Sequence, residues 1–157
     1  MYKEMKNKNG FTLIELLVSI SIIAILTALL TANFIGARQR GRDGQRKADL
    51  QQIRSALELY RADNGNYPTG AKFPTCGSCL SASGTCLATD TKYMQKIPCD
   101  PISGSSFSYT PTASCDNATT TCTTYSIYAC LENGQDSEKD SSNLCTAPYF
   151  SYTLTNP

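Results

Sequence analysis

The sequence of 157 residues contains no histidine and no tryptophan, and its net charge is only +1. Histidine is the commonest general base and the commonest zinc ligand, so its absence removes the usual routes to acid–base catalysis and to zinc binding. The small net charge gives no indication of a nucleic-acid partner. No cysteine occurs before residue 76, and the length fits one domain of ordinary size with little left over.

Charge divides the chain into four segments of different character. Residues 1–10 carry a net charge of +2 and residues 11–36 a net charge of −1, whereas residues 37–63 carry +3 and residues 64–157 carry −3. All the cysteines lie in the last segment. We therefore expect a short basic segment, an apolar helix, a charged helix and a cysteine-rich head, with those boundaries.

The apolar segment is long enough to span a membrane. Of residues 11–35, 18 are apolar, and a helix of this length covers roughly 37 Å, more than the ~30 Å of a hydrocarbon core. A buried core helix would show a longer polar stripe than the one formed by Thr12, Glu15 and Ser19. A cleaved secretory signal would be shorter and would end in an Ala-x-Ala site, which is missing here. The pattern predicts a retained membrane helix over residues 11–36.

Glu15 is the unusual residue of this segment, because it is the only charged side chain in it. An ionised carboxylate inside a membrane costs a few kcal/mol, so such a residue needs a partner or a function. Two interpretations are open. Glu15 lies near the lipid headgroups, or it pairs with a positive group on a neighbouring copy of the chain.

Apolar residues continue at helical spacing beyond the membrane segment. They recur every three or four positions, which indicates a one-sided amphipathic helix: Leu50, Ile53, Leu57 and Tyr60. The two helical patterns can form one continuous helix over residues 11–63. Asn64 and Gly65 favour a left-handed cap at its end, and Pro68 prevents the helix from resuming.

A run of basic residues lies in the first half of the amphipathic segment: Arg38, Arg40, Arg42, Arg46 and Lys47. Nucleic-acid binding is one interpretation, but the run lacks interleaved aromatic residues and is interrupted by Asp43 and Asp49. We therefore expect no nucleic-acid partner. The run is predicted to form a solvated or subunit-facing surface of the helix.

The head contains an even number of cysteines, and we predict that they form disulfide bonds: Cys76, Cys79, Cys86, Cys99, Cys115, Cys122, Cys130 and Cys145. Serine and threonine make up 28 of residues 69–157, so disulfides would compensate for a thin core. Locality favours pairing Cys115 with Cys122 and Cys130 with Cys145, and the other four admit several pairings. A four-thiolate zinc site over residues 76–99, or a redox Cys-x-x-Cys, is disfavoured by its spacing and surroundings, so we predict no metal site.

Three stretches of the head alternate apolar and polar residues and are rich in Tyr, Thr, Phe and Ile, which is typical of strands: Ser106–Thr110, Thr123–Leu131 and Tyr149–Leu154. In the second stretch, alternate residues from Tyr125 to Leu131 share one apolar face that should pack on the helix. The predicted fold is α+β, with a long N-terminal helix packed on a small antiparallel sheet and with loops stapled by disulfides.

The stretch Lys8-Asn9-Gly10-Phe11-Thr12-Leu13-Ile14-Glu15 resembles the prepilin motif of type IV pilins and type II secretion pseudopilins. The segments from Leu57 to Pro68 and from Tyr93 to Pro101 are similar to parts of major pseudopilins, and together the similar parts cover about half the chain. This resemblance implies a pilin-like fold. The many cysteines depart from the typical secretion pseudopilin.

The resemblance also implies a processing pathway. In that family a prepilin peptidase cleaves after the glycine, the new N-terminal phenylalanine is N-methylated, and the glutamate is required for assembly. Carried over to this chain, the cleavage lies between Gly10 and Phe11, Phe11 is methylated, Glu15 is the assembly residue, and residues 1–10 are a leader. The leader would face the cytoplasm and the head would be extracytoplasmic, in a single-pass protein of the cytoplasmic membrane, although the charges flanking the helix favour the opposite orientation.

Calcium is the one cofactor that the resemblance raises, because major pseudopilins bind it in a late loop. The segment from Glu132 to Asp140 offers oxygen ligands, but it lacks the spacing of an EF-hand. A solvated acidic loop is the alternative interpretation.

No arrangement of residues indicates catalysis, so we predict that the protein is not an enzyme. The resemblance implies a structural subunit of a type II secretion pseudopilus, which assembles with other copies and with minor pilins into a periplasmic or cell-surface filament. A type IV pilin for adhesion, motility or DNA uptake is the first alternative. A membrane-anchored extracytoplasmic binding module is the second.

Overall fold

The structure of the protein, a computed structural model, describes residues 10–111 and 115–157, and at residues 31–33 it describes the backbone alone. The described chain divides into two compact units, one ending at Arg38 and the other beginning at Gln39. The first unit is helical and the second contains the sheets and all the disulfides.

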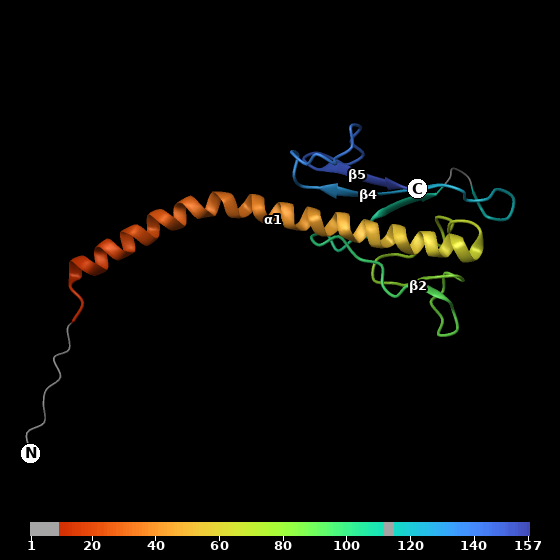
Figure 1. Ribbon diagram of the computed structural model, residues 1–157, viewed down its shortest axis with the longest axis horizontal. Coiled ribbons are helices and arrows are strands. Elements are labelled where there is room, and N and C mark those ends of the chain that lie inside the picture. The colour runs from red at the N-terminus through yellow and green to blue at the C-terminus, as the bar shows by residue number, and fades with distance from the viewer. Residues whose placement is uncertain (1–9, 112–114) are drawn as a thin grey trace, which may run out of the picture. The chain divides into compact units, whose positions relative to one another are not determined.

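Helix α1 runs from Leu13 to Asn64 (Figure 1). Its stretch Leu13–Leu30 has a mean hydropathy of 2.6, is entirely exposed, and is long and apolar enough to cross a membrane. The helix ends within one residue of the predicted end. Gly65 adopts a φ of 74°, and its N–H donates to the carbonyl of Arg61 over 2.8 Å, which is the left-handed cap that the sequence predicts.

Three strands form an antiparallel sheet in the order β3–β4–β5. Strand β3 spans Ser108–Pro111, β4 spans Tyr125–Leu131 and β5 spans Phe150–Thr155. At the centre of the sheet, Tyr128 lies opposite Ser108 of β3 and Thr153 of β5. Each predicted strand is therefore confirmed, with its start shifted by one or two residues.

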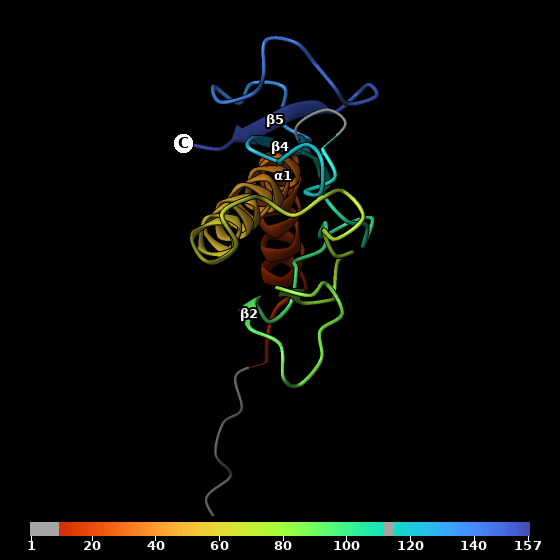
Figure 2. The same ribbon diagram turned by 90° about the vertical axis from the view of Figure 1, so that its right-hand side faces the viewer.

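The core of the head lies between this sheet and the C-terminal part of α1. Alternate residues of β4 are buried, and they belong to the same cluster as the apolar stripe of the helix: Tyr125, Ile127, Ala129, Leu131, Leu50, Ile53, Leu57 and Tyr60. This confirms the predicted packing of the alternating face on the helix. In Figure 2 the C-terminal part of the helix lies below β4 and β5.

A second, smaller sheet was not predicted. Strand β1, Leu80–Ser81, pairs antiparallel with β2, Lys92–Met94. Strands of two and three residues are too short to show an alternating pattern, so the sequence offers no signal for them. Figures 1 and 2 place β2 on the side of α1 opposite β4 and β5. Leu80 and Ile97 belong to the same buried core.

All eight cysteines lie in the described residues and all are paired. The bonds join Cys76 to Cys99, Cys79 to Cys86, Cys115 to Cys122 and Cys130 to Cys145. The structure has both pairs that locality favoured. The bond between Cys79 and Cys86 lies within the loop that Cys76 and Cys99 close. The spacing of these four cysteines in the sequence therefore did not predict their pairing. Cys76 and Cys79, the residues of the Cys-x-x-Cys sequence, are bonded to different partners and not to each other.

Candidate functional site

The residues of the predicted cleavage and assembly motif lie at the start of α1. Gly10 and Phe11 precede the helix and are exposed, and residues 1–9 fall outside the described residues. Thr12 and Glu15 form a reciprocal cap. The backbone N–H and the hydroxyl of Thr12 donate to Glu15 Oε2 over 2.9 and 2.7 Å, and the N–H of Glu15 lies 3.3 Å from Thr12 Oγ1. The motif Thr12-x-x-Glu15 signals this capping box, which sequence analysis missed.

Three polar side chains further along the apolar helix also form hydrogen bonds within the helix. The hydroxyls of Ser19, Ser21 and Thr27 each donate to the backbone carbonyl four residues earlier, over 2.7 to 2.8 Å. Such bonds remove the need for water at these positions. The surface of Leu13–Leu30 is therefore suited to lipid or to the apolar helices of other chains.

Only part of the basic run is the solvated or subunit-facing surface that the sequence predicted, because Arg38 and Arg40 are exposed. Arg42 and Arg46 instead form a network with carboxylates of the head. Arg42 binds Glu132 through two hydrogen bonds of 2.8 and 2.6 Å. Arg46 is only 2 % exposed and donates to Asp100 over 2.6 Å, and to Asp43 and Glu132 over 2.8 Å each. Charge-assisted hydrogen bonds of a buried guanidinium are strong and directional, so Arg46 holds the helix to the segments that carry Asp100 and Glu132.

Asp43 joins the helix to the end of strand β4. Its carboxylate accepts the backbone N–H of Glu132 over 2.9 Å and that of Asn133 over 2.8 Å, besides its bond to Arg46. The side chain is 2 % exposed. Asp43, which interrupts the basic run, is therefore part of the site. It fixes the point at which the chain leaves the sheet after β4.

The network changes the acidity of its members. Burial raises the pKa of Asp100, but its bonds to Arg46 and to the N–H groups of Ser103 and Ile102 outweigh this and lower it to about 2. The bond to Arg42 lowers the pKa of Glu132, also to about 2. Both carboxylates therefore stabilise the fold at neutral pH, and that contribution is lost as the pH falls from about 4 through 2.

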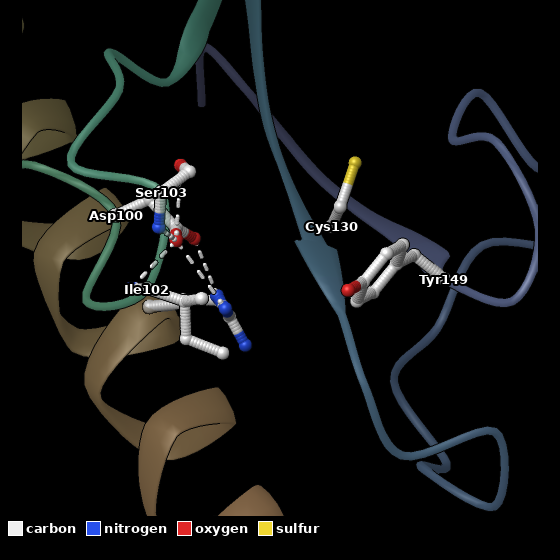
Figure 3. Close-up of a pocket in the computed structure, with 6 residues that line it drawn as sticks. Asp100, Ile102, Ser103, Cys130 and Tyr149 are labelled. Atoms are coloured by element: carbon white, nitrogen blue, oxygen red, sulfur yellow. Dashed lines mark hydrogen bonds and ion pairs between the residues drawn. The ribbon is translucent and has the colours of Figure 1, made fainter.

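A surface hollow lies beside the network. In Figure 3, Asp100, Ile102 and Ser103 line one side of it, and Cys130 and Tyr149 line the other. Cys130 is held in a disulfide, and the hydroxyl of Ser103 donates to Asp100 over 3.2 Å. These side chains therefore hold one another in place.

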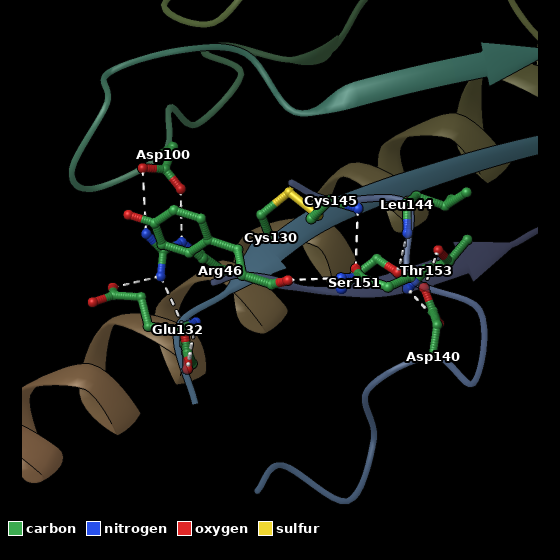
Figure 4. The surroundings of a disulfide bond; sticks show 12 residues. Arg46, Asp100, Cys130, Glu132, Asp140, Leu144, Cys145, Ser151 and Thr153 are labelled. Atoms are coloured by element: carbon green, nitrogen blue, oxygen red, sulfur yellow. Dashed lines mark hydrogen bonds and ion pairs between the residues drawn. A yellow bond between two sulfur atoms is a disulfide. The ribbon is translucent and has the colours of Figure 1, made fainter. Parts of the chain in front are cut away.

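The acidic loop after β4 is tied to its surroundings at several points. Figure 4 shows the bond between Cys130 and Cys145 close to the pair of Arg46 and Asp100. Asp140 accepts the backbone N–H and the hydroxyl of Thr153 in β5, over 3.2 and 2.6 Å. In the described part of the chain, no three acidic or sulfur side chains gather as metal ligands would.

Asp49 is the one buried carboxylate of the described residues that has an unpaired oxygen. It is 8 % exposed, and its Oδ2 has no hydrogen-bond partner. Burial raises the pKa of Asp49. Because the folded state holds the proton more tightly, this residue weakens the fold increasingly as the pH rises from about 4 through its raised pKa.

We expect Asp49→Asn to increase the free energy of unfolding by about 1 kcal/mol at pH 7, because it removes a buried charge without a partner. Urea titrations of both proteins at pH 7 and pH 4 measure the effect. The gain should shrink at pH 4, where more of the wild-type carboxyl is protonated than at pH 7. A gain that is absent at pH 7, or equal at both pH values, would contradict this account.

Comparison with known proteins supplies the context for these features. A family model described as "Prokaryotic N-terminal methylation motif" matches residues 5–31. A second model, described as "Type II secretion system (T2SS), protein G", matches residues 33–144. No solved structure matches the chain.

Similar curated proteins come from both secretion systems and pili. The type IV wide pilus major component PilA4 of Thermus thermophilus is 48% identical over 63 residues, which cover 40% of this chain and 48% of that protein. The type II secretion system core protein G of Vibrio cholerae is 33% identical over 67 residues, 43% of this chain and 46% of that protein. The Escherichia coli protein of the same name is 36% identical over 62 residues, 40% and 43% respectively. The chain thus spans about half the length of the curated relatives it matches.

Proposed function

Because the chain belongs to the type II secretion system protein G family, we propose that it is a structural subunit of a type II secretion pseudopilus or of a related type IV pilus-like filament. The observation that carries this proposal is the exposed apolar surface of Leu13–Leu30, none of which is buried. Such a surface needs a lipid or protein environment, and a filament subunit uses both in turn. The head, in contrast, has its own core and four disulfides.

The proposed pathway begins with processing. A prepilin peptidase cuts between Gly10 and Phe11 on the cytoplasmic side, and Phe11 is then N-methylated. The exposure of both residues is compatible with access by an enzyme. The helix crosses the cytoplasmic membrane once and carries the head on the extracytoplasmic side, where disulfides form and persist.

Assembly would bring the apolar helices of many copies, and of minor pilins, together. In the single chain the carboxylate of Glu15 accepts hydrogen bonds from the backbone N–H and the hydroxyl of Thr12. Inside a helix bundle this negative charge would need a positive partner, because charges in an apolar environment are costly when unpaired. We infer that Glu15 pairs with a positive group of a neighbouring copy, which gives the filament its register.

Two substitutions separate the cap from the charge. Glu15→Gln keeps a capping side chain but removes the charge, whereas Thr12→Val removes the capping hydroxyl and keeps the charge. We expect Glu15→Gln to lower filament yield about tenfold or more, since ~1.4 kcal/mol lost per contact is tenfold in an association constant. Thr12→Val should lower it much less.

The measurement is the amount of sheared filament protein relative to membrane protein, in cells that produce equal amounts of each variant. Membrane insertion of Glu15→Gln should be normal, because removing a charge eases insertion. If Glu15→Gln assembles as well as wild type, the charge has no role in assembly.

A type IV pilus is the second candidate. It is favoured by the similarity to a type IV wide pilus component over 63 residues. Detection of the filaments on the cell surface, without overproduction of the subunit, would favour the pilus over a periplasmic pseudopilus.

A further inference from the structure

Lys47 lies where two carboxylates of the acidic loop converge. Its Nζ donates to Asp136 Oδ1 over 2.6 Å and to Glu138 Oε2 over 2.7 Å. The loop is 89 and 91 residues away in the sequence, so this contact fixes it to the helix. The side chains of Lys47 and Asp136 are 18 % and 15 % exposed, whereas that of Glu138 is 61 % exposed.

The surroundings of the ammonium group suit a cation. The group lies 5.3 Å from the centre of the Tyr152 ring, a distance at which a ring face attracts positive charge. Asp136 Oδ1 also accepts the backbone N–H of Glu138 over 2.9 Å, so the turn holds its own carboxylate in position. The pKa of Lys47 reflects this, because burial lowers it but the bonds to Asp136 and Glu138 outweigh burial and raise it.

The distances are close to those of a metal site. Calcium binds oxygen at about 2.3–2.6 Å, and the two carboxylate oxygens here lie only slightly farther from a common point. That point is filled by the ammonium nitrogen. The remaining acidic side chains of the loop are bound elsewhere, Glu132 by Arg42 and Arg46, and Asp140 by Thr153.

The residues present therefore do not fit the calcium ion that the pseudopilin resemblance implies for this loop. We propose that the Lys47 ammonium takes the place of a divalent cation and holds the loop to the helix without any metal. The head consequently has no need of calcium. Removal of the ammonium exposes a weak divalent-cation site made by Asp136 and Glu138.

The test compares thermal midpoints of the full-length protein in a non-ionic detergent, with excess EDTA and with calcium chloride at about 5 mM. This concentration exceeds the ~0.1–1 mM dissociation constants of weak extracellular sites. We expect wild type to unfold at the same temperature in both. Lys47→Met should unfold roughly 3–6 °C lower in EDTA and should recover about half of that loss in calcium.

Lys72→Met is the matched control, because Lys72 is exposed and its removal causes the same change of charge. It should leave the midpoint unchanged in both buffers. Lys47→Arg keeps a cation at the loop, so its midpoint, unlike that of Lys47→Met, should be the same in EDTA and in calcium. A wild-type protein stabilised by calcium would overturn the proposal, and so would a Lys47→Met protein that calcium leaves unchanged.

Terbium luminescence gives a second readout that does not depend on stability. Tyr152 would lie next to a lanthanide bound in place of the ammonium, and excitation of a tyrosine ring sensitises a nearby terbium ion. We expect Lys47→Met to show saturable emission that calcium displaces. Equal emission from wild type and Lys47→Met would place the bound ion elsewhere and contradict the proposal.

Discussion

We expect Arg46→Met to lower the free energy of unfolding by about 3–5 kcal/mol, because it leaves three partly or fully buried carboxylates without their shared cation. The three are Asp43, Asp100 and Glu132, each within 2.8 Å of the guanidinium. Methionine fills much of the same space, so lost packing contributes little. A domain of this size holds only about 5–15 kcal/mol in total, so this loss is a large fraction of its stability.

Urea denaturation followed by circular dichroism measures this loss. Arg40→Met is the matched control, because Arg40 lies on the same helix but is exposed, and its replacement should change stability by no more than about 0.5 kcal/mol. Adding Asp100→Asn to Arg46→Met should restore part of the lost stability, because it removes one of the carboxylates that Arg46→Met leaves without a cation. A loss below about 1 kcal/mol for Arg46→Met would mean that the network does not hold the head together.

Reduction of the four disulfides should unfold the sheets of the head while much of helix α1 remains. The chain-entropy model assigns roughly 3 kcal/mol to the loop between Cys130 and Cys145, which are 15 residues apart, and roughly 2 kcal/mol to the loop between Cys115 and Cys122, 7 apart. Four such bonds together approach the total stability of a small domain. Circular dichroism with and without reductant should show loss of strand signal with helix signal retained.

Paired replacements assign this effect to individual bonds. Cys130→Ser with Cys145→Ser should cost more stability than Cys115→Ser with Cys122→Ser, because the longer loop regains more freedom in the unfolded chain. After loss of the bond between Cys130 and Cys145, the acidic loop is still held by Lys47 and by the bonds of Asp140 to Thr153. If the thermal midpoint is unchanged on full reduction, the disulfides do not stabilise the head.

The elements of the fold could be predicted because their signals are local. An apolar run, an apolar stripe at helical spacing and a Gly65 cap define α1, and alternation defines β4. The capping box of Thr12 and Glu15 was equally visible in the sequence but was not used. Strands β1 and β2 are too short to carry any pattern, although Leu80 of β1 lies in the buried core.

The ionic network could not be predicted, and the reason is physical. A cluster of arginines on a helix indicates positive charge, but two of the three partners of Arg46 lie 54 and 86 residues later in the chain. Nothing local distinguishes Glu132, which enters the network, from Glu138, which remains largely exposed. The interpretation of the run as an outward-facing surface was therefore wrong for Arg42, Arg46 and Lys47, whereas Arg38 and Arg40 are exposed as expected.

The mass of the subunit within the filament tests the central claim most directly. Filaments sheared from cells with an active prepilin peptidase are purified, and the intact mass of their protein is determined. The account predicts one dominant species that begins at Phe11 and carries a single additional methyl group, with all cysteines oxidised. Filaments built from a chain that retains residues 1–10, or a processed chain found only in the membrane and never in filaments, would contradict it.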